Sequence, residues 1–145
     1  MSIPIHDNGQ DLTGTLAINL QLGDPAPNDG LDREQLLVAL KYNEQDFAGS
    51  GKSGWFEDEF IEIQKQLPNG VYMRACINCL YSDYSPYGHG LFGHMMCFRN
   101  LKQEYLKVTS KGEFWPIHDR YDRLVQETHL CPDFKRRIPG TGYRG

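Results

Sequence analysis

Long apolar runs are absent from this sequence of 145 residues. No stretch approaches the roughly twenty apolar residues of a transmembrane helix, and the mean hydropathy is −0.56, so the sequence predicts no membrane span. The first residues, MSIPIHDNGQDL, lack a basic patch followed by an apolar segment. We therefore expect no secretory signal and a cytoplasmic protein.

Several well-known catalytic signatures are also missing. The motifs H-E-x-x-H, G-x-S-x-G and H-x-E do not occur, which argues against common zinc proteases, α/β-hydrolases and nucleobase deaminases. The loop AGSGKSG (48–54) has Asp46 where a phosphate-binding Walker motif needs its first glycine. We favour a protein without catalytic activity. The alternative is a small metal- or cysteine-dependent enzyme, built on Cys131 or on a metal site with one of three histidines: His89, His94 and His129.

The composition fits a globular protein with an uneven charge distribution. Hydrophobic residues make up 39% and charged residues 23%, and the length suits one domain over residues 1–145. Residues 1–68 carry 12 acidic and 4 basic side chains, whereas residues 69–145 carry 7 and 11. The acidic half has a net charge of −8 and the basic half +4, giving −4 for the chain. This balance favours a basic protein partner and disfavours nucleic acid.

Hydrophobic periodicity predicts both strands and helices. Alternation with period two indicates strands at 12–22, 35–42, 71–77 and 95–100, although Asp32 as a cap would allow a helix over 35–42. An apolar stripe formed by Phe56, Phe60, Ile63 and Leu67 predicts an amphipathic helix. We expect its outer face to be acidic, through Glu57, Asp58, Glu59 and Glu62.

A capping box at Ser110 and Glu113 predicts a second helix. The side chains that we expect this helix to bury are Phe114, Ile117, Tyr121 and Leu124 or Val125. The predicted fold is therefore a small α+β domain with antiparallel strands, two main helices and a metal-knuckle loop.

The four cysteines have the spacing C-x2-C-x17-C-x33-C, at Cys76, Cys79, Cys97 and Cys131. Two thiols three residues apart can bind one ion if the chain turns between them, and zinc prefers four such ligands. We therefore predict a structural Zn²⁺ site formed by all four cysteines. His89, His94 or His129 in place of Cys97 or Cys131, unliganded buried thiols, and iron–sulfur or redox chemistry stay open as alternatives. Cys131, before Pro132 and near Lys135, Arg136 and Arg137, is also a candidate reactive thiol at a helix start.

The loop YSDYSPYGHGLFG (81–93) is rich in aromatic residues and glycine. Exposed tyrosines are typical of binding surfaces, so Tyr84 and Tyr87 join the acidic residues Glu57, Asp58, Glu59 and Glu62 as predicted partner-binding residues. The competing interpretation is that the rings of this loop pack over the metal knuckle. A second alternative function, binding of single-stranded nucleic acid by this loop and the basic tail, is less favoured.

Three segments resemble an uncharacterised bacterial family, a domain of unknown function: CINCLYSDYSP, FGHMMCFRNLKQEYL and ETHLCPDFKRRIPGTGYRG. The resemblance covers roughly the C-terminal half and has the pattern C-x-x-C…C…CP…GYRG, which ends at Gly142-Tyr143-Arg144-Gly145. It implies that the four cysteines act as one set, and it implies no activity. The predicted function is a zinc-stabilised, non-enzymatic protein-binding module, for example an immunity protein that neutralises a bacterial toxin through an acidic surface. The sequence does not indicate the oligomeric state.

Overall fold

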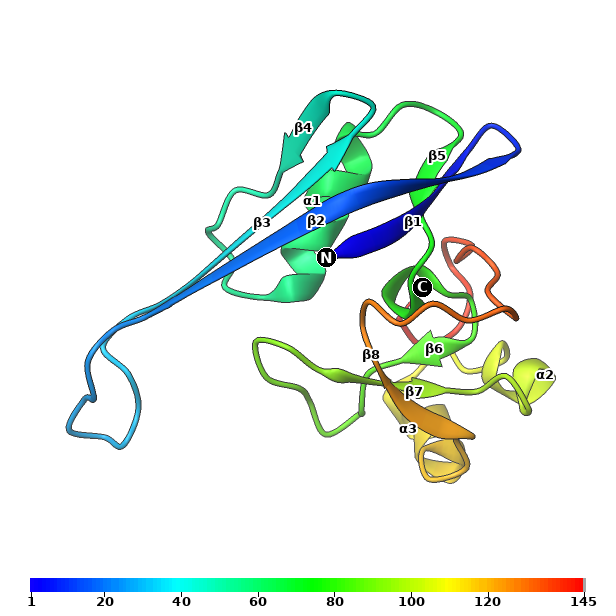
Figure 1. The fold of residues 1–145 in the computed structure, drawn as a ribbon. Helices are drawn as coiled ribbons and strands as arrows, with labels where there is room; N and C mark the ends of the chain where they lie inside the picture. The colour runs from blue at the N-terminus through cyan, green and yellow to red at the C-terminus, as the bar shows by residue number, and fades with distance from the viewer. Residues whose placement is uncertain (145) are drawn as a thin grey trace. The chain divides into compact units, whose positions relative to one another are not determined.

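The computed structural model describes residues 1–144 and divides into two compact units, Met1–Met73 and the chain from Arg74 onward (Figure 1). This boundary lies at residue 73, close to the predicted change from the acidic to the basic half at residue 68. Residues 69–73, which lie between the two boundaries, contain no charged side chain. The first unit therefore has a net negative charge and the second unit a net positive charge. Gly145, the last residue of the GYRG motif, lies outside the described residues.

The first unit contains one five-stranded antiparallel sheet with the order β4-β3-β2-β1-β5. The predicted strands at 12–22 and 35–42 are confirmed, and the helical alternative for 35–42 is wrong. The sequence pattern does not predict the first and fourth strands, since their core side chains are only Ile3, Ile5 and Phe47. The strands are β1 (Ser2–Asp7), β2 (Gln10–Leu22), β3 (Glu34–Tyr42), β4 (Gln45–Ala48) and β5 (Val71–Met73).

The predicted amphipathic helix is confirmed as α1 (Phe56–Gln66), which lies against the sheet (Figure 1). It buries Phe56, Phe60 and Ile63, as the apolar stripe predicts. Glu59 is also fully buried, so its predicted place on the outer face is wrong. The position of Glu59 explains its burial. Glu59 comes three residues after Phe56 and four before Ile63, so the three side chains lie on one face of the helix.

Strands β2 and β3 extend well beyond their neighbours as a two-stranded ribbon (Figure 1). Strand β1 pairs only with residues 10–15 of β2, and β4 pairs only with residues 39–42 of β3. The β2–β3 ladder continues to the pair Leu22 and Glu34. We call residues 17–38 the ribbon arm. The prediction of a half-buried strand is wrong for this part of β2, which has no covering layer.

The second unit contains a three-stranded antiparallel sheet with the order β6-β7-β8. The strand predicted at 95–100 is confirmed in part, since the observed strand begins at His94 and ends at Cys97. The strands are β6 (Ser82–Asp83), β7 (His94–Cys97) and β8 (Arg123–Gln126). The helical segments are η1 (Cys76–Asn78), α2 (Lys102–Tyr105), α3 (Lys111–Phe114) and η2 (Trp115–Ile117).

The second predicted helix exists but is shorter than expected. Ser110 Oγ accepts a hydrogen bond from the Glu113 N–H at 3.3 Å, which confirms the capping box. Phe114 and Ile117 are buried as predicted, but α3 and η2 together end at Ile117. Leu124 and Val125 lie in β8, because pairing with β7 provides hydrogen bonds that override the helical pattern.

The core of the second unit is aromatic. Phe98 stacks on Tyr105 with ring centroids 4.9 Å apart and planes 3° apart, and Phe114 packs against both rings. The chain is therefore an α+β protein with antiparallel sheets and two main helical segments, as predicted. No helix within residues 1–144 has the length and apolar character needed to cross a membrane.

Candidate functional site

The C-x-x-C motif forms a tight turn. Strand β5 ends at Met73, so the predicted strand is wrong for residues 74–77, and the chain instead turns through η1 at Cys76. The Cys79 N–H donates to the Cys76 carbonyl at 2.9 Å, and the Cys76 N–H donates to the His129 carbonyl at 2.9 Å. Both thiols are buried. The chain thus turns between the two cysteines, as a metal knuckle requires.

Two backbone amides donate hydrogen bonds to the Cys79 thiol. Burial raises the pKa of Cys79, while the N–H groups of Tyr81 and Lys135 act in the opposite direction by favouring the thiolate. Lys135 lies on the C-terminal segment, which is joined to the knuckle by a bond from the Leu80 N–H to the Lys135 carbonyl at 2.7 Å. The amide groups around Cys79 are therefore arranged to stabilise negative charge on sulfur.

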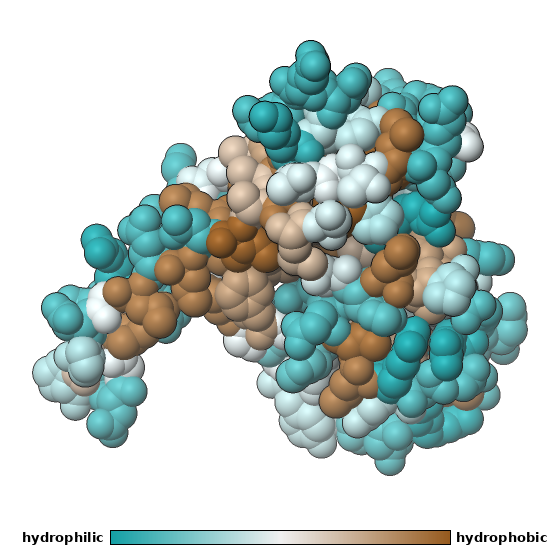
Figure 2. Space-filling model, in the orientation of Figure 1, coloured by the Kyte–Doolittle hydropathy of each residue, from teal (hydrophilic) through white to brown (hydrophobic). Residues whose placement is uncertain are grey.

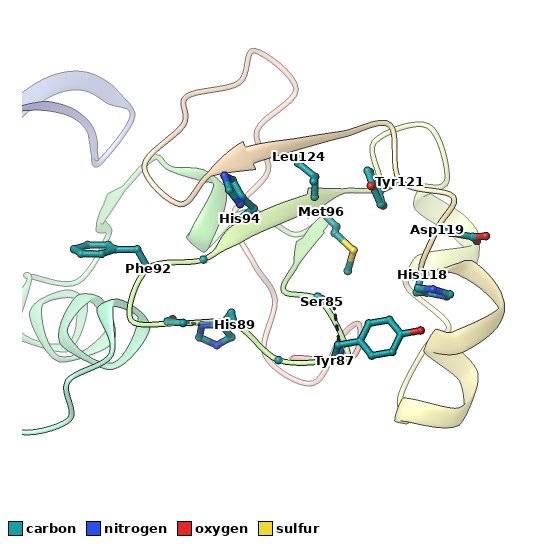
Figure 3. A pocket seen from close by; sticks show the side chains of 13 residues that line it. Ser85, Tyr87, His89, Phe92, His94, Met96, His118, Asp119, Tyr121 and Leu124 are labelled. Atoms are coloured by element: carbon teal, nitrogen blue, oxygen red, sulfur yellow. Dashed lines mark hydrogen bonds between the residues drawn. The ribbon is translucent and has the colours of Figure 1, made fainter. Parts of the chain in front are cut away.

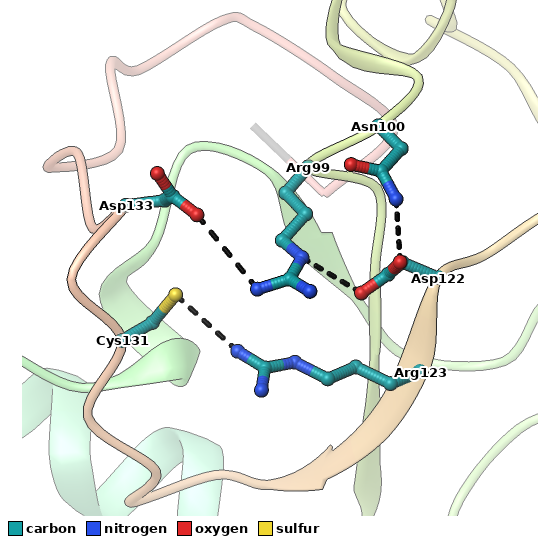
Figure 4. A network of polar contacts seen from close by, with 6 residues as sticks. All are labelled: Arg99, Asn100, Asp122, Arg123, Cys131 and Asp133. Carbon is teal, nitrogen blue, oxygen red and sulfur yellow. Dashed lines mark hydrogen bonds and ion pairs between the residues drawn. The ribbon is translucent and has the colours of Figure 1, made fainter.

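Arg123 connects the other two cysteines, and Figure 4 shows its contact with Cys131. Cys97 ends β7 and pairs with Arg123 of β8, whose Nη2 lies 3.3 Å from the Cys131 sulfur. Cys131 is followed by a turn in which the Phe134 N–H donates to the Cys131 carbonyl at 3.1 Å, and no helix begins there. The predicted helix start at Cys131 is therefore wrong, and its thiol is buried rather than exposed.

The four thiols influence one another electrostatically. The pKa of Cys76 is raised to about 12, mainly by burial and then by the thiols of Cys79, Cys97 and Cys131, whereas Arg123 acts in the opposite direction. All four side chains are buried. All three of the other thiols act electrostatically on Cys76, but within residues 1–144 no three of these side chains form a metal-binding group, so the predicted ligand set stays a prediction. We call the four residues the four-cysteine cluster.

An ionic network lies beside this cluster (Figure 4). Arg99 Nε is 2.7 Å from an Asp122 carboxylate oxygen, and Arg99 Nη1 is 3.8 Å from Asp133. Asp122 is the main cause of the raised pKa of Arg99, and the thiols of Cys97 and Cys131 add to it. The guanidinium group of Arg123 therefore contacts a sulfur atom, and that of Arg99 is held nearby between two carboxylates.

The predicted zinc site stays a prediction. Within residues 1–144, no three His, Cys, Asp or Glu side chains form a ready-made metal-binding group. Among the histidines named as alternative ligands, His129 is joined to the cluster through its carbonyl. Its Nε2 is buried and has no hydrogen-bond partner among the described residues. Burial lowers the pKa of His129, and Arg123 adds to this effect.

The opposite face of the same sheet forms a pocket of about 460 Å³ (Figure 3). Side chains alternate along β7, so His94 and Met96 face the pocket while Met95 and Cys97 face the other side. His89 also lines this pocket. No cysteine is among the lining residues, so an enzyme that pairs a cysteine with His94 has no support from this arrangement.

The aromatic loop supplies one wall of the pocket. Tyr87 is 75% exposed and packs edge-on against Trp115 with ring centroids 4.6 Å apart. Tyr84 is buried, stacks on His89 at 3.7 Å and donates from its hydroxyl to Glu127 at 2.7 Å. Tyr84 is therefore not positioned to contact a partner directly. Packing over the knuckle, the competing interpretation of this loop, is confirmed for Tyr84, which lies against Cys76.

The acidic residues of α1 are only partly available to a partner. Glu59 accepts hydrogen bonds from the Gly51 N–H at 2.8 Å and the Ser53 hydroxyl at 3.2 Å. Glu62 accepts one from the Ser50 N–H at 2.6 Å. These two carboxylates hold the glycine-rich loop over 48–54 by hydrogen bonds. Of the predicted acidic face, Glu57 is half-buried and Asp58 is exposed.

Replacing Glu59 by alanine should lower the free energy of unfolding of the first unit by about 2–3 kcal/mol. The carboxylate is buried, and its loss leaves the Gly51 N–H and the Ser53 hydroxyl without their acceptor. Urea denaturation measured by circular dichroism tests this, with Asp58→Ala as the exposed control. Equal stability of the two variants would contradict the structural role of Glu59.

Comparison with known families gives one match. The pattern of a family of unknown function (DUF6304) matches residues 1–82. The chain belongs to this family. The match contains the C-x-x-C motif but ends before Cys97 and Cys131, so it covers the first unit and the knuckle rather than the C-terminal half. No curated protein and no solved structure matches the chain. Membership of DUF6304 therefore assigns no activity.

Proposed function

We propose that this chain is a protein-binding module whose ribbon arm docks on a basic protein partner. The observation that carries this proposal is a row of exposed apolar side chains along an arm with an acidic tip. The proposal keeps the class of partner that the charge distribution predicts. It moves the binding surface from α1, where Glu59 and Glu62 are engaged in the fold, to the arm.

The apolar side chains of the arm are exposed in an unusual number. Ile18, Leu20 and Leu22 project from one face of β2 and are 38%, 41% and 57% exposed. Leu31 and Leu37 are exposed to a similar degree. Figure 2 shows hydrophobic residues gathered along the arm. A group of large exposed apolar side chains on a protruding ribbon is typical of a protein-interaction surface.

The arm also lacks the support that other strands have. Beyond residue 16, β2 has only β3 as a neighbour, and residues 34–38 of β3 have no strand on their other side. The base of the arm is covered, since Leu36 and Val38 are buried and the Gly49 N–H donates to the Val38 carbonyl at 3.0 Å. The outer part, up to the pair Leu22 and Glu34, has only the two-strand pairing. A two-stranded ribbon is marginally stable in water unless its apolar face packs against another surface. A bound partner would supply that surface and bury the exposed leucines.

The tip of the arm indicates the charge of the partner. Asp24, Asp29, Asp32 and Glu34 are exposed there, against one basic residue, Arg33. The tip is ordered by paired bonds, in which Asp32 Oδ1 accepts the Asp24 N–H at 2.8 Å and the Asp24 carbonyl accepts the Asp32 N–H at 2.9 Å. Acidic charge at a fixed position steers a basic partner and repels the same tip of a second copy.

Neutralisation of a basic toxin, the immunity-protein hypothesis, is one specific form of this function. Recognition of single-stranded nucleic acid has less support, because Tyr81 and Tyr84 are buried and unavailable for stacking on bases. The arm, moreover, is acidic and would repel phosphate.

Purification of the tagged chain from its host, followed by mass spectrometry, identifies the proteins that are recovered with it. A recovered protein is then produced separately and its direct binding to the chain is measured. We expect a partner with a pI above about 9. Calorimetry should show that Leu20→Ser/Leu22→Ser weakens binding at least about tenfold, or about 1.4 kcal/mol. The matched control is Ile61→Ser, which changes an equally exposed apolar residue on α1.

Three outcomes would overturn the proposal. An acidic partner would contradict the predicted charge of the partner. Unchanged affinity of the double variant would show that the arm is not the binding surface. Sedimentation that shows a dimer of the free chain, abolished by the double variant, would identify a second copy as the occupant of the arm.

A further inference from the structure

We propose that the four-cysteine cluster binds one Zn²⁺ ion through Cys76, Cys79, Cys97 and Cys131, and that this ion stabilises the second unit. The site is independent of partner binding by the arm. The spacing along the chain indicates which residues belong together. Hydrogen bonds in the structure connect the three segments that carry them, which are the Cys76–Cys79 turn, β7 and the segment around Cys131.

Backbone hydrogen bonds connect the knuckle to the C-terminal segment. The Cys76 N–H donates to the His129 carbonyl at 2.9 Å, and the Arg137 N–H donates to the Asn78 carbonyl at 2.8 Å. These bonds join the segment on either side of Cys131 to the knuckle. The segment that carries Cys131 is thus joined to the turn that carries Cys76 and Cys79 before any metal binds.

Strand pairing connects Cys97, the remaining proposed ligand, to the knuckle. Ser82 of β6 pairs with Cys97 of β7, and the Ser82 hydroxyl donates to the Cys76 carbonyl. The Phe98 N–H donates to the Tyr81 carbonyl at 2.8 Å, which extends this connection beyond the strand. Cys97 is therefore joined to the knuckle through its neighbours on both strands.

The groups around the sulfur atoms suit a negatively charged centre. Four thiolates with one Zn²⁺ carry a net charge of −2, which needs nearby donors and cations. Two backbone amides donate to Cys79, and Arg123 donates to Cys131. Arg123 Nε is buried without a hydrogen-bond partner among the described residues. A zinc–thiolate centre would place negative charge beside this half-buried guanidinium group.

The surroundings favour a structural rather than a catalytic site. Cys76 packs against Tyr84 and Met95, and Cys79 packs against Leu80 and Tyr81, so the sulfur atoms are enclosed by core side chains. Four protein ligands leave no open coordination position, which is typical of structural zinc. Binding requires the thiol side chains to rotate toward a common centre about 2.3 Å from each sulfur, with loss of four protons.

Elemental analysis of the full chain, expressed with zinc available, tests the site directly. We expect one zinc ion per chain, and release of this ion by a chelator should lower the melting temperature of the second unit. In the zinc-bound protein, all four thiols should react with a thiol reagent at least about tenfold more slowly than after chelation. His94→Ala is the control, because His94 lies on the opposite face of the sheet and should leave zinc binding unchanged.

Cobalt titration of the metal-free wild-type chain keeps the test valid if cysteine variants fail to fold. Absorption bands of tetrahedral thiolate-bound Co²⁺, removed by added zinc, would support the site. A chain that stays colourless with Co²⁺, contains no zinc and keeps four slowly reacting thiols would show simple buried cysteines and overturn the proposal. Bound iron with inorganic sulfide would overturn the assignment of zinc. Retention of full zinc binding by Cys131→Ser, combined with its loss in His129→Ala, would overturn the four-cysteine ligand set.

Discussion

A Phe98→Ala variant is expected to lose about 3–5 kcal/mol of the free energy of unfolding of the second unit. Phe98 is fully buried and stacks on Tyr105 at 4.9 Å, and its ring also meets Phe114 at 5.7 Å. Truncation removes the transfer free energy of the ring and leaves a cavity that three surrounding elements cannot easily fill. This cost is a large fraction of the stability of a small protein.

Urea denaturation followed by tryptophan fluorescence measures this loss. A Trp55→Phe background leaves Trp115 as the reporter, and Trp115 lies in η2 beside the aromatic core. The matched control is Phe92→Ala, since Phe92 is 39% exposed and its truncation should change stability by less than about 1 kcal/mol. Similar midpoints for the two variants would show that Phe98 is not central to this core.

The elements that the sequence predicts best are those whose own periodicity determines their environment. Strands β2 and β3 and helix α1 have regular apolar patterns, and all three form as predicted. The same patterns do not show what covers each face. Leu16 is buried whereas Leu20 and Leu22 are exposed, although their spacing is the same, because the neighbouring strand β1 ends beside residue 15. The arm could therefore not be predicted from local sequence.

Buried polar groups are the second kind of feature that the pattern misses. Glu59 falls within the apolar stripe of α1 by its spacing, and that position is a usable signal for burial. The groups that donate hydrogen bonds to its carboxylate come from a loop, however, so the reason for its burial appears only in the folded chain. For the four-cysteine cluster the situation is reversed, since the sequence indicates the set of residues but not the roles of Arg123 and Lys135.

Asp83 is expected to make the stability of the second unit depend on pH in an unusual direction. This carboxyl group is buried, and its oxygens accept bonds from the Tyr105 hydroxyl at 2.9 Å and from the Tyr84 N–H at 2.8 Å. Burial raises its pKa, and this effect exceeds the opposite effects of Arg144, the Tyr105 hydroxyl and Arg137.

The sign follows from proton linkage. A carboxyl group with a raised pKa in the folded state binds its proton more tightly there than in the unfolded chain. Its contribution to stability is therefore complete below the ordinary value of about 3.9 and is lost as the pH rises through the folded-state pKa. Most surface carboxylates with lowered pKa values, such as Glu113, act in the opposite direction.

Comparison of wild type with Asp83→Asn isolates this contribution, since all other titrating groups are common to both chains. Wild type should gain stability relative to the variant as the pH is lowered from neutral toward about 4. Urea denaturation at a series of pH values, with Trp115 as the reporter, measures the difference. The Asp83→Ala variant should lose about 1–3 kcal/mol at neutral pH, because the Tyr105 hydroxyl and the Tyr84 N–H lose their buried acceptor. A difference between wild type and Asp83→Asn that is independent of pH would show that the fold does not shift the pKa of Asp83. A difference that favours the variant at low pH would show that the fold stabilises the charged form.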